Sequence, residues 1–182
     1  GAISGETARF RRQHSHSNYD EALLLEVIEP SADRISPACE YFGQCGGCAL
    51  QHLAYDAQLR LKQQSLLQAL QRIGNVTPTT VLAPLAGRPF AYRRRARLGA
   101  RVVEKKGRVL LGFRERRNSC ITDMSSCATL EPELSRLIPP LTSLIDSLHI
   151  RNRVPQIEVS KGDNAISVVI RVLDAPGVGD RH

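Results

Sequence analysis

The sequence has no tryptophan, a single methionine, and aromatic residues that make up only 4% of the chain. A core dominated by large aromatic side chains is therefore excluded, and the 42% of hydrophobic residues must pack mainly through Leu, Ile and Val. No apolar run approaches the ~20 residues that a membrane-spanning helix needs. Residues 1–12 also lack the basic-then-apolar order of a signal peptide, so we expect a cytoplasmic protein without a membrane partner.

An initiator methionine is also missing, because the first residue is Gly1 and strand-like sequence begins shortly after it. We expect these 182 residues to be an excised piece of a longer protein. Their number is enough for one full domain and a fragment of another.

Acidic residues are in deficit: 18 Asp and Glu stand against 25 Lys and Arg, which gives a net charge of +7. Arg greatly outnumbers Lys, and its planar, weakly hydrated guanidinium suits phosphates and base edges. The totals alone fit a nucleic-acid-binding protein and a merely basic, soluble surface equally well.

The first third of the chain predicts a β-hairpin and a helix. Residues 6–11 and 21–28 are strand-like, and the polar stretch 14–18 between them is typical of a loop. Two strands are too few for a stable domain, so we interpret them as the end of a small β-barrel. Leucines at helical spacing predict a helix over residues 55–73.

The remainder predicts an antiparallel sheet with flanking helices, which together indicate the α+β class. Residues 92–103 and 108–114 alternate as two strands of a meander, joined by a turn at Gly107. An apolar stripe from Leu134 to Leu148 predicts a helix that Pro139-Pro140 kinks or splits. Residues 156–161 and 165–173 predict a closing hairpin around Gly162-Asp163-Asn164.

Three of the five cysteines lie close together, in the order Cys39-x5-Cys45-x2-Cys48. The intervening glycines favour a turn-rich loop on which several sulfurs converge and backbone N–H groups approach them. In a cytosolic protein such clustering indicates a metal or cluster site more often than disulfides.

The kind of metal and the fourth ligand are less clear from spacing. Zinc sites usually pair their ligands as two C-x2–4-C units, whereas three ligands plus a distant fourth is common for iron–sulfur clusters. Cys120 and Cys127 compete for the fourth position. Cys127 is favoured because it lies in a Ser-rich loop, whereas Cys120 lies in a strand-like stretch as an ordinary half-buried thiol.

Three motifs resemble one known family. They are Cys39-Glu-Tyr-Phe-Gly-Gln-Cys45-Gly-Gly-Cys48-Ala-Leu-Gln51-His52, then Tyr92-Arg-Arg-Arg-Ala-Arg97-Leu98, then Gly112-Phe113-Arg114. In this order they resemble the RlmD type of 23S rRNA (uracil-C5)-methyltransferases across nearly the whole chain. The resemblance implies a [4Fe-4S] cluster on Cys39, Cys45, Cys48 and Cys127, and it favours iron–sulfur over zinc.

The resemblance also implies three parts: an OB-like TRAM barrel, a central α/β domain with the cluster, and a Rossmann-like methyltransferase domain. We therefore expect residues 1–36 to be the end of the barrel, residues 37–53 the cluster loop, and residues 54–75 a helix. Residues 76–182 form the central RNA-binding domain in this division. The S-adenosylmethionine site and the catalytic residues are expected in the absent C-terminal domain, so the piece itself should be a catalytically inactive monomer.

Positive charge is concentrated between Arg88 and Arg117, where ten Arg and two Lys face two Glu, a local excess of +10. Strand alternation predicts that four arginines share one face, which would bind RNA with a steep salt dependence. A solvated face, or one paired with acids of the missing domain, is the alternative. The predicted contacts to 23S rRNA are Tyr92, Arg93, Arg95, Arg97, Arg101 and Arg114.

A weaker basic patch comprises His14, His16, Arg9, Arg11 and Arg12, and could help the barrel remnant to hold rRNA. Two other functions compete with the methyltransferase assignment. One is a zinc-binding RNA module without an enzymatic parent, and the other is a redox protein whose cluster transfers electrons. In the favoured hypothesis the cluster is structural, because methyl transfer to uracil C5 through a cysteine adduct needs no electron transfer.

Overall fold

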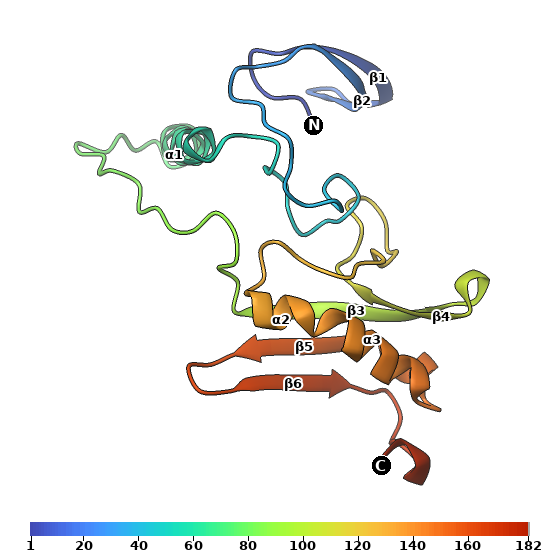
Figure 1. The fold of residues 1–182 in the computed structure, drawn as a ribbon. Helices are drawn as coiled ribbons and strands as arrows, with labels where there is room; N and C mark the ends of the chain where they lie inside the picture. The colour runs from blue at the N-terminus through green and yellow to red at the C-terminus, as the bar shows by residue number, and fades with distance from the viewer. Residues whose placement is uncertain (182) are drawn as a thin grey trace. The chain divides into compact units, whose positions relative to one another are not determined.

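A computed structural model describes residues 1–181, which form two compact units (Figure 1). The first unit combines residues 1–37 with residues 50–84, and the second combines residues 38–49 with the chain from Leu85 onward. Both sheets are antiparallel and the helices are few, so the predicted mixed class with antiparallel sheets is confirmed. None of the helices in the described residues combines the length and apolarity needed to cross a membrane.

The first unit begins with a hairpin of β1 (Thr7–Ser15) and β2 (Asp20–Glu29). Both predicted strands are confirmed, but β1 runs further than expected and takes in His14 from the predicted loop. The turn is correspondingly tight: the His16 backbone N–H donates to the Tyr19 carbonyl at 2.9 Å, and the two rings stack.

A buried carboxylate holds the base of this hairpin to the segment that follows it. The Glu6 side chain is fully buried and accepts hydrogen bonds from the Arg34 guanidinium and from the backbone N–H groups of Ile3 and Ser31. These donors, Arg34 foremost, lower the pKa of Glu6 to about 2 against the desolvation that raises it.

Helix α1 (Tyr55–Arg72) confirms the predicted helix to within one residue. Its attachment to the preceding segment is polar, since the Arg60 guanidinium pairs with the Asp33 carboxylate at 3.0 Å. Only Ala57 of the helix is buried, and Leu66 is 60% exposed. The predicted apolar stripe is therefore present but largely uncovered within this unit.

The second unit contains a four-stranded antiparallel sheet in the order β4-β3-β5-β6. Its strands are β3 (Arg95–Val103), β4 (Arg108–Gly112), β5 (Gln156–Lys161) and β6 (Ile166–Arg171). Two hairpins form it, and β3 pairs with β5 to join them. The turn between β3 and β4 is the 3-10 segment Glu104–Lys106 followed by Gly107, whose φ of 65° is left-handed, as glycine allows.

Helices α2 (Pro132–Arg136) and α3 (Ile138–Ser147) cover one face of this sheet (Figure 1). The predicted split of one long helix is confirmed, because the chain bends at Leu137, just before Pro139-Pro140, and α3 starts with proline in its first turn. The core between sheet and helices is aliphatic, as the lack of aromatics predicts. Its fully buried members include Leu98, Val109, Leu111, Leu134, Ile138, Ile145 and Ile157.

The opposite face of the sheet, termed the outer face, carries the side chains of alternate strand residues. Along β3 the predicted alternation is confirmed: Ala96, Leu98 and Ala100 are buried, whereas the arginines between them are exposed. Part of the outer face is covered by the segment after β4, since a Cβ on Gly99 would lie 2.5 Å from the Ile121 side chain. Short 3-10 segments at Arg151–Arg153 and Val178–Asp180 complete the unit.

Candidate cysteine centre and arginine surface

The cysteine loop, residues 38–49, consists of turns and belongs to the second unit. It is fastened to the segment after β4 by backbone hydrogen bonds: Gly46 N–H donates to the Arg114 carbonyl and Arg116 N–H donates to the Gln44 carbonyl, each at 2.8 Å. A Cβ on Gly46 would lie only 2.8 Å from that Arg114 oxygen. Glycine is therefore required for this close approach of two backbones.

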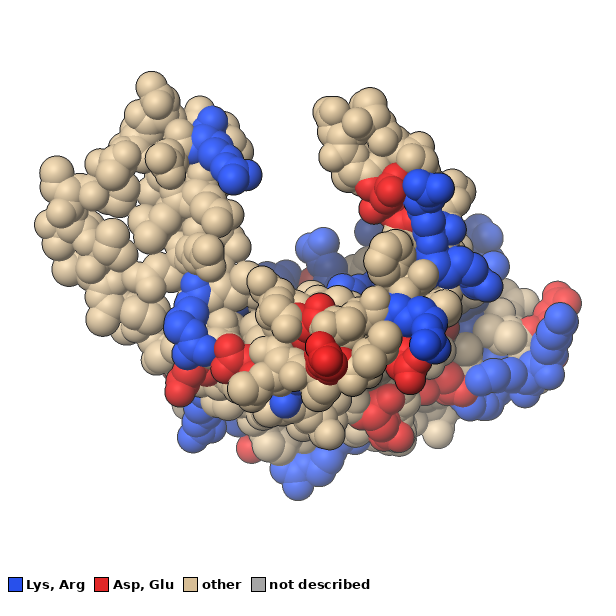
Figure 2. Space-filling model, turned by 90° about the horizontal axis from the view of Figure 1, so that it is seen from above, with Lys and Arg blue, Asp and Glu red and all other residues tan. Residues whose placement is uncertain are grey.

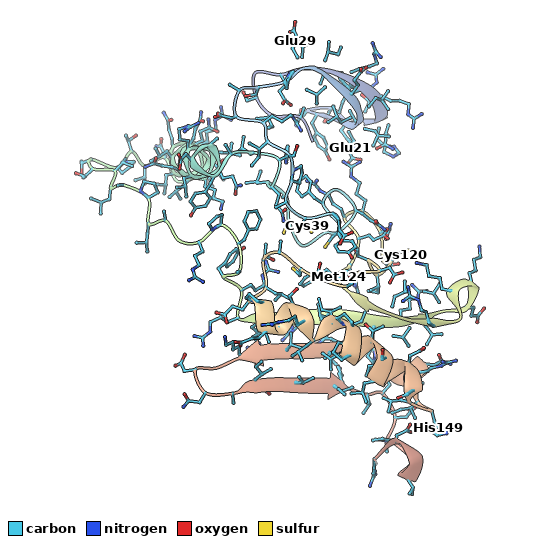
Figure 3. All side chains as sticks on the ribbon, viewed as in Figure 1. Glu21, Glu29, Cys39, Cys120, Met124 and His149 are labelled. Carbon is cyan, nitrogen blue, oxygen red and sulfur yellow. The ribbon has the colours of Figure 1, made fainter. Side chains whose placement is uncertain are left out.

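Four cysteines of the second unit differ in exposure from the fifth. Cys45 and Cys127 are buried at 9% exposure, and Cys39 and Cys48 are half-buried. Cys120 is exposed, so the expectation of a half-buried thiol was wrong: residues 118–119 form a bend instead of a strand, and Asn118 Oδ1 accepts the Cys120 backbone N–H at 2.7 Å. Cys39 and Cys120 are labelled in Figure 3.

The environment of Cys45 brings further cysteines into the same region. Burial raises the pKa of the Cys45 thiol, and electrostatic repulsion by the nearby side chains of Cys48 and Cys127 acts in the same direction. The backbone N–H of Gly47, 3.4 Å from the Cys45 sulfur, and the hydroxyl of Thr122 oppose that rise in pKa. Cys45 is thus close enough to two other cysteines for their charges to interact.

Cys39 joins this region through an open depression of about 410 Å³ that it lines together with Cys127. The walls also contain Glu40, Ser126, Ser135 and Arg136. The space is well above the ~30 Å³ that one water occupies in the liquid. The cysteine loop and the Cys127 loop therefore share one cavity within the second unit.

The donor chemistry suits an iron–sulfur cluster, because four cysteine side chains lie in one region and a backbone N–H already points at one sulfur. The four cysteine side chains do not converge in the arrangement of coordinating ligands. Within the described residues, no group of three or more His, Cys, Asp and Glu side chains has the arrangement of a metal site. The residues thus fit the cluster in chemistry and location rather than in preformed geometry.

The outer face holds two exposed arginines of β3 that share one acidic partner. Arg95 and Arg97 pair with Glu158 of β5 at 3.0 and 3.1 Å, and the hydrogen bond from Arg95 is the main reason that the pKa of Glu158 is lowered. The sequence prediction missed Glu158, which lies opposite Arg97 only because of the strand register. On the face drawn in Figure 2, basic side chains likewise lie beside acidic ones.

Arg101 and Arg114 are exposed and have no ion-pair partner among the residues that the structure describes. The Ile121 side chain packs on Gly99, between Arg97 and Arg101 along β3. The predicted arginine row is therefore divided into a paired part near Glu158 and an unpaired part beyond Ile121.

Tyr92 and Arg93 lie before β3, so the alternation begins later than expected. The Arg93 guanidinium lies over the Phe113 ring, 5.6 Å from its centre, and the residue is half-buried instead of exposed in the arginine row. Its backbone N–H donates to the Thr129 carbonyl at 2.9 Å. Tyr92 is 51% exposed and remains accessible to a ligand.

The weaker basic patch on the hairpin of the first unit is partly neutralised. Arg9 pairs with Glu26 at 2.8 Å and Arg12 with Asp20 at 3.5 Å. His16 lies 3.9 Å from Glu21. These pairs join the two strands and reduce the local excess of positive charge that the sequence suggested.

No protein-family model matches the chain. It is 48% identical over 174 residues to the "23S rRNA (uracil(1939)-C(5))-methyltransferase RlmD" of Thiobacillus denitrificans, an alignment that covers 96% of this chain and 40% of that protein. Proteins of the same name from Aromatoleum aromaticum and Bordetella parapertussis are 46% and 44% identical over 173 residues, 95% of this chain. The resemblance found in the motifs is confirmed, and the chain spans about 40% of the length of these relatives.

Proposed function

We propose that this chain, a homologue of the RlmD-type 23S rRNA (uracil-C5)-methyltransferases over about 95% of its length, is the RNA-recognition and [4Fe-4S]-binding part of such an enzyme. The observation that carries the proposal is the fastening of the cysteine loop to an arginine segment by the Gly46–Arg114 hydrogen bond. Both features lie in the second unit, and both lie in the motifs that first suggested the family.

The whole protein would transfer a methyl group to C5 of a uracil in 23S rRNA, as the names of the relatives imply, and the family resemblance implies that S-adenosylmethionine is the methyl donor. Since the chain spans about 40% of their length, we assign methyl transfer and S-adenosylmethionine binding to the remaining part of the protein. We assign no catalytic residue to the 182 residues. Their task in the reaction is to bind and orient RNA, in a monomeric cytoplasmic enzyme.

The cluster would be held by Cys39, Cys45, Cys48 and Cys127, and its contribution when bound is a covalent clasp between two loops. Such a crosslink, formed between residues as distant in sequence as Cys48 and Cys127, removes chain entropy from the unfolded state. Because the cysteine loop also bonds to Arg114 and Arg116, the clasp would hold this arginine segment in place for RNA. The donor set and the shared cavity support this role.

In this proposal the β1–β2 hairpin, within residues 1–36, is the end of an OB-like TRAM barrel. Residues 37–53 form the cluster loop, residues 54–75 carry the helix, and residues 76–182 form the central RNA-binding domain. The uncovered leucines of α1 are consistent with a helix that packs on a further part of the protein.

RNA would lie on Tyr92, Arg93, Arg95, Arg97, Arg101 and Arg114, with Tyr92 and Arg97 nearest to the target uridine. The exposure of Tyr92 and of the arginines of β3 supports this assignment, because phosphates and unstacked bases need accessible guanidinium and aromatic groups. The unpaired Arg101 and Arg114 are the strongest candidates for phosphate contacts, since binding costs them no internal ion pair.

The test is anaerobic purification followed by iron, sulfide and zinc analysis, together with RNA binding at several salt concentrations. We expect a brown protein with iron and sulfide, and RNA affinity that falls with salt by roughly 0.7 log unit per log unit of salt for each phosphate contacted in a single strand. Cys45→Ser should lose iron and weaken RNA binding together. A colourless zinc protein, or a Cys45→Ser variant with unchanged fold and RNA affinity, would overturn the clasp.

A further inference from the structure

Two buried threonines stand beside the two buried cysteines of the second unit. Thr122 and Thr129 are 0% and 4% exposed, and they belong to the small set of buried polar residues in the described chain. The Thr129 hydroxyl lies 3.3 Å from the Cys127 sulfur. The Thr122 hydroxyl is also buried, and it is one of the groups that lower the pKa of the Cys45 thiol.

The Thr122 hydroxyl has no hydrogen-bonding partner of normal geometry within the described residues. Buried hydroxyls are otherwise nearly always bonded, so an exception needs an explanation. A protonated thiol is a weak acceptor, whereas a thiolate sulfur is a strong one. The Thr122 hydroxyl, which has no other acceptor, is therefore suited to donate a hydrogen bond to a thiolate at Cys45.

At Cys127 the direction of the hydrogen bond depends on whether the sulfur carries a proton. In the contact with Thr129 either the thiol or the hydroxyl can donate while the sulfur carries a proton. A metal-bound thiolate has no proton to give, so the hydroxyl must then donate. Ligation of both cysteines would leave two hydroxyl donors directed at two sulfurs.

The backbone fixes both threonines in these places. The Thr122 N–H donates to the Phe113 carbonyl at 2.9 Å, and its own carbonyl presses against Gly112, where a Cβ would lie only 2.3 Å away. The Thr129 carbonyl accepts the backbone N–H groups of Tyr92 and Arg93 at 3.2 and 2.9 Å. These contacts fix the backbone of each threonine beside the cysteine that its hydroxyl faces.

We propose that Thr122 and Thr129 are positioning residues that donate hydrogen bonds to the metal-bound thiolates of Cys45 and Cys127 and so tune the cluster. The inference rests on the proposed cluster, and it adds residues that the cysteine motif alone does not indicate. Hydrogen bonds to ligand sulfurs stabilise the more electron-rich state of a cluster and thereby shift its reduction potential.

Removal of either donor should therefore make the cluster easier to oxidise. In the anaerobically reconstituted chain, Thr122→Val and Thr129→Val should each shift the midpoint potential to a more negative value. Their visible absorbance should also bleach faster in air than that of the wild type. Thr122→Ser and Thr129→Ser keep the hydroxyl and should behave like the wild type.

Thr142→Val is a matched control, because the Thr142 hydroxyl donates to the Ile138 carbonyl within α3, at 2.8 Å. Val variants that contain as much iron as the wild type, with the same midpoint potential and bleaching rate, would overturn this inference and leave the proposed cluster standing. If the Val variants do not incorporate iron and sulfide, Ser variants with wild-type properties support the donor role. Ser variants that also fail to incorporate iron and sulfide contradict it. A wild-type chain without iron and sulfide overturns the proposed cluster and this inference with it.

Discussion

Gly46 donates its backbone N–H to the carbonyl oxygen of Arg114 at 2.8 Å, in the contact between the cysteine loop and the segment after β4. This bond joins the two features that the sequence predicted separately, a metal site and an RNA-binding arginine. In the proposed function it would connect the cluster to RNA recognition, since loosening of the cysteine loop would also loosen the segment that carries Arg114.

A methyl group at position 46 should break this contact. In Gly46→Ala the new Cβ would lie 2.8 Å from the Arg114 oxygen, and neither backbone can yield without loss of the bond. We expect a loss of about 1–3 kcal/mol in the free energy of unfolding, as is usual for overpacking. Urea denaturation of Gly46→Ala measures it, and Gly87→Ala is the control, because its Cβ would meet open space. Equal midpoints for the two variants would contradict the prediction.

The choice of Cys127 over Cys120 as the fourth ligand leads to a second prediction. Cys127 is buried, lines the same depression as Cys39 and interacts with Cys45, whereas Cys120 is exposed. After anaerobic reconstitution, Cys127→Ser should lose most of its iron and its visible absorbance, and Cys120→Ser should retain both. The measurement is iron per chain, with circular dichroism to verify that each variant is folded. The reverse pattern would make Cys120 the ligand.

Much of the second unit could be predicted from sequence because its signals are local. The two-residue period of β3 places Ala96 and Leu98 in the core, and the Gly162-Asp163-Asn164 turn fixes the hairpin of β5 and β6. The split before Pro139-Pro140 follows from proline chemistry within a single helix.

The rest depends on contacts between distant residues, which periodicity does not encode. Glu158 neutralises Arg95 and Arg97 because of the β3–β5 register, and Ile121 reaches the outer face because the chain turns after residue 117. Thr122 could not be singled out either, since a threonine in an irregular segment has no sequence pattern that indicates a buried hydroxyl beside a sulfur.

Glu158 should act as an internal competitor of RNA phosphate for Arg95 and Arg97. In Glu158→Gln both guanidinium groups lose their carboxylate partner and one negative charge disappears from the outer face. We expect RNA to bind roughly 2–5-fold more tightly at low salt, the modest gain that release of an exposed ion pair allows. Fluorescence anisotropy with a labelled rRNA segment measures the affinity and its salt dependence.

Glu133→Gln serves as the matched control, because Glu133 pairs with Lys161 instead of an arginine of β3. Its affinity should change less than that of Glu158→Gln although both variants gain one positive charge. An equal gain in the two variants would mean that total charge, and not release of Arg95 and Arg97, governs binding.

The first unit should lose stability in acid through Glu6. Its pKa is lowered from 4.5 to about 2 in the folded chain, so the carboxylate contributes fully above pH 4.5. That contribution is lost progressively as the pH falls from about 4.5 towards 2, because protonation of the carboxylate breaks its ion pair with Arg34.

The difference in unfolding free energy between wild type and Glu6→Gln should therefore be largest near neutral pH and shrink towards pH 2. Denaturation followed at pH 6, 4 and 2.5 measures it, with Glu26→Gln, at the exposed Arg9 pair, as the control. A difference that stays constant with pH would show that the buried Glu6 carboxylate does not hold the base of the hairpin through its charge.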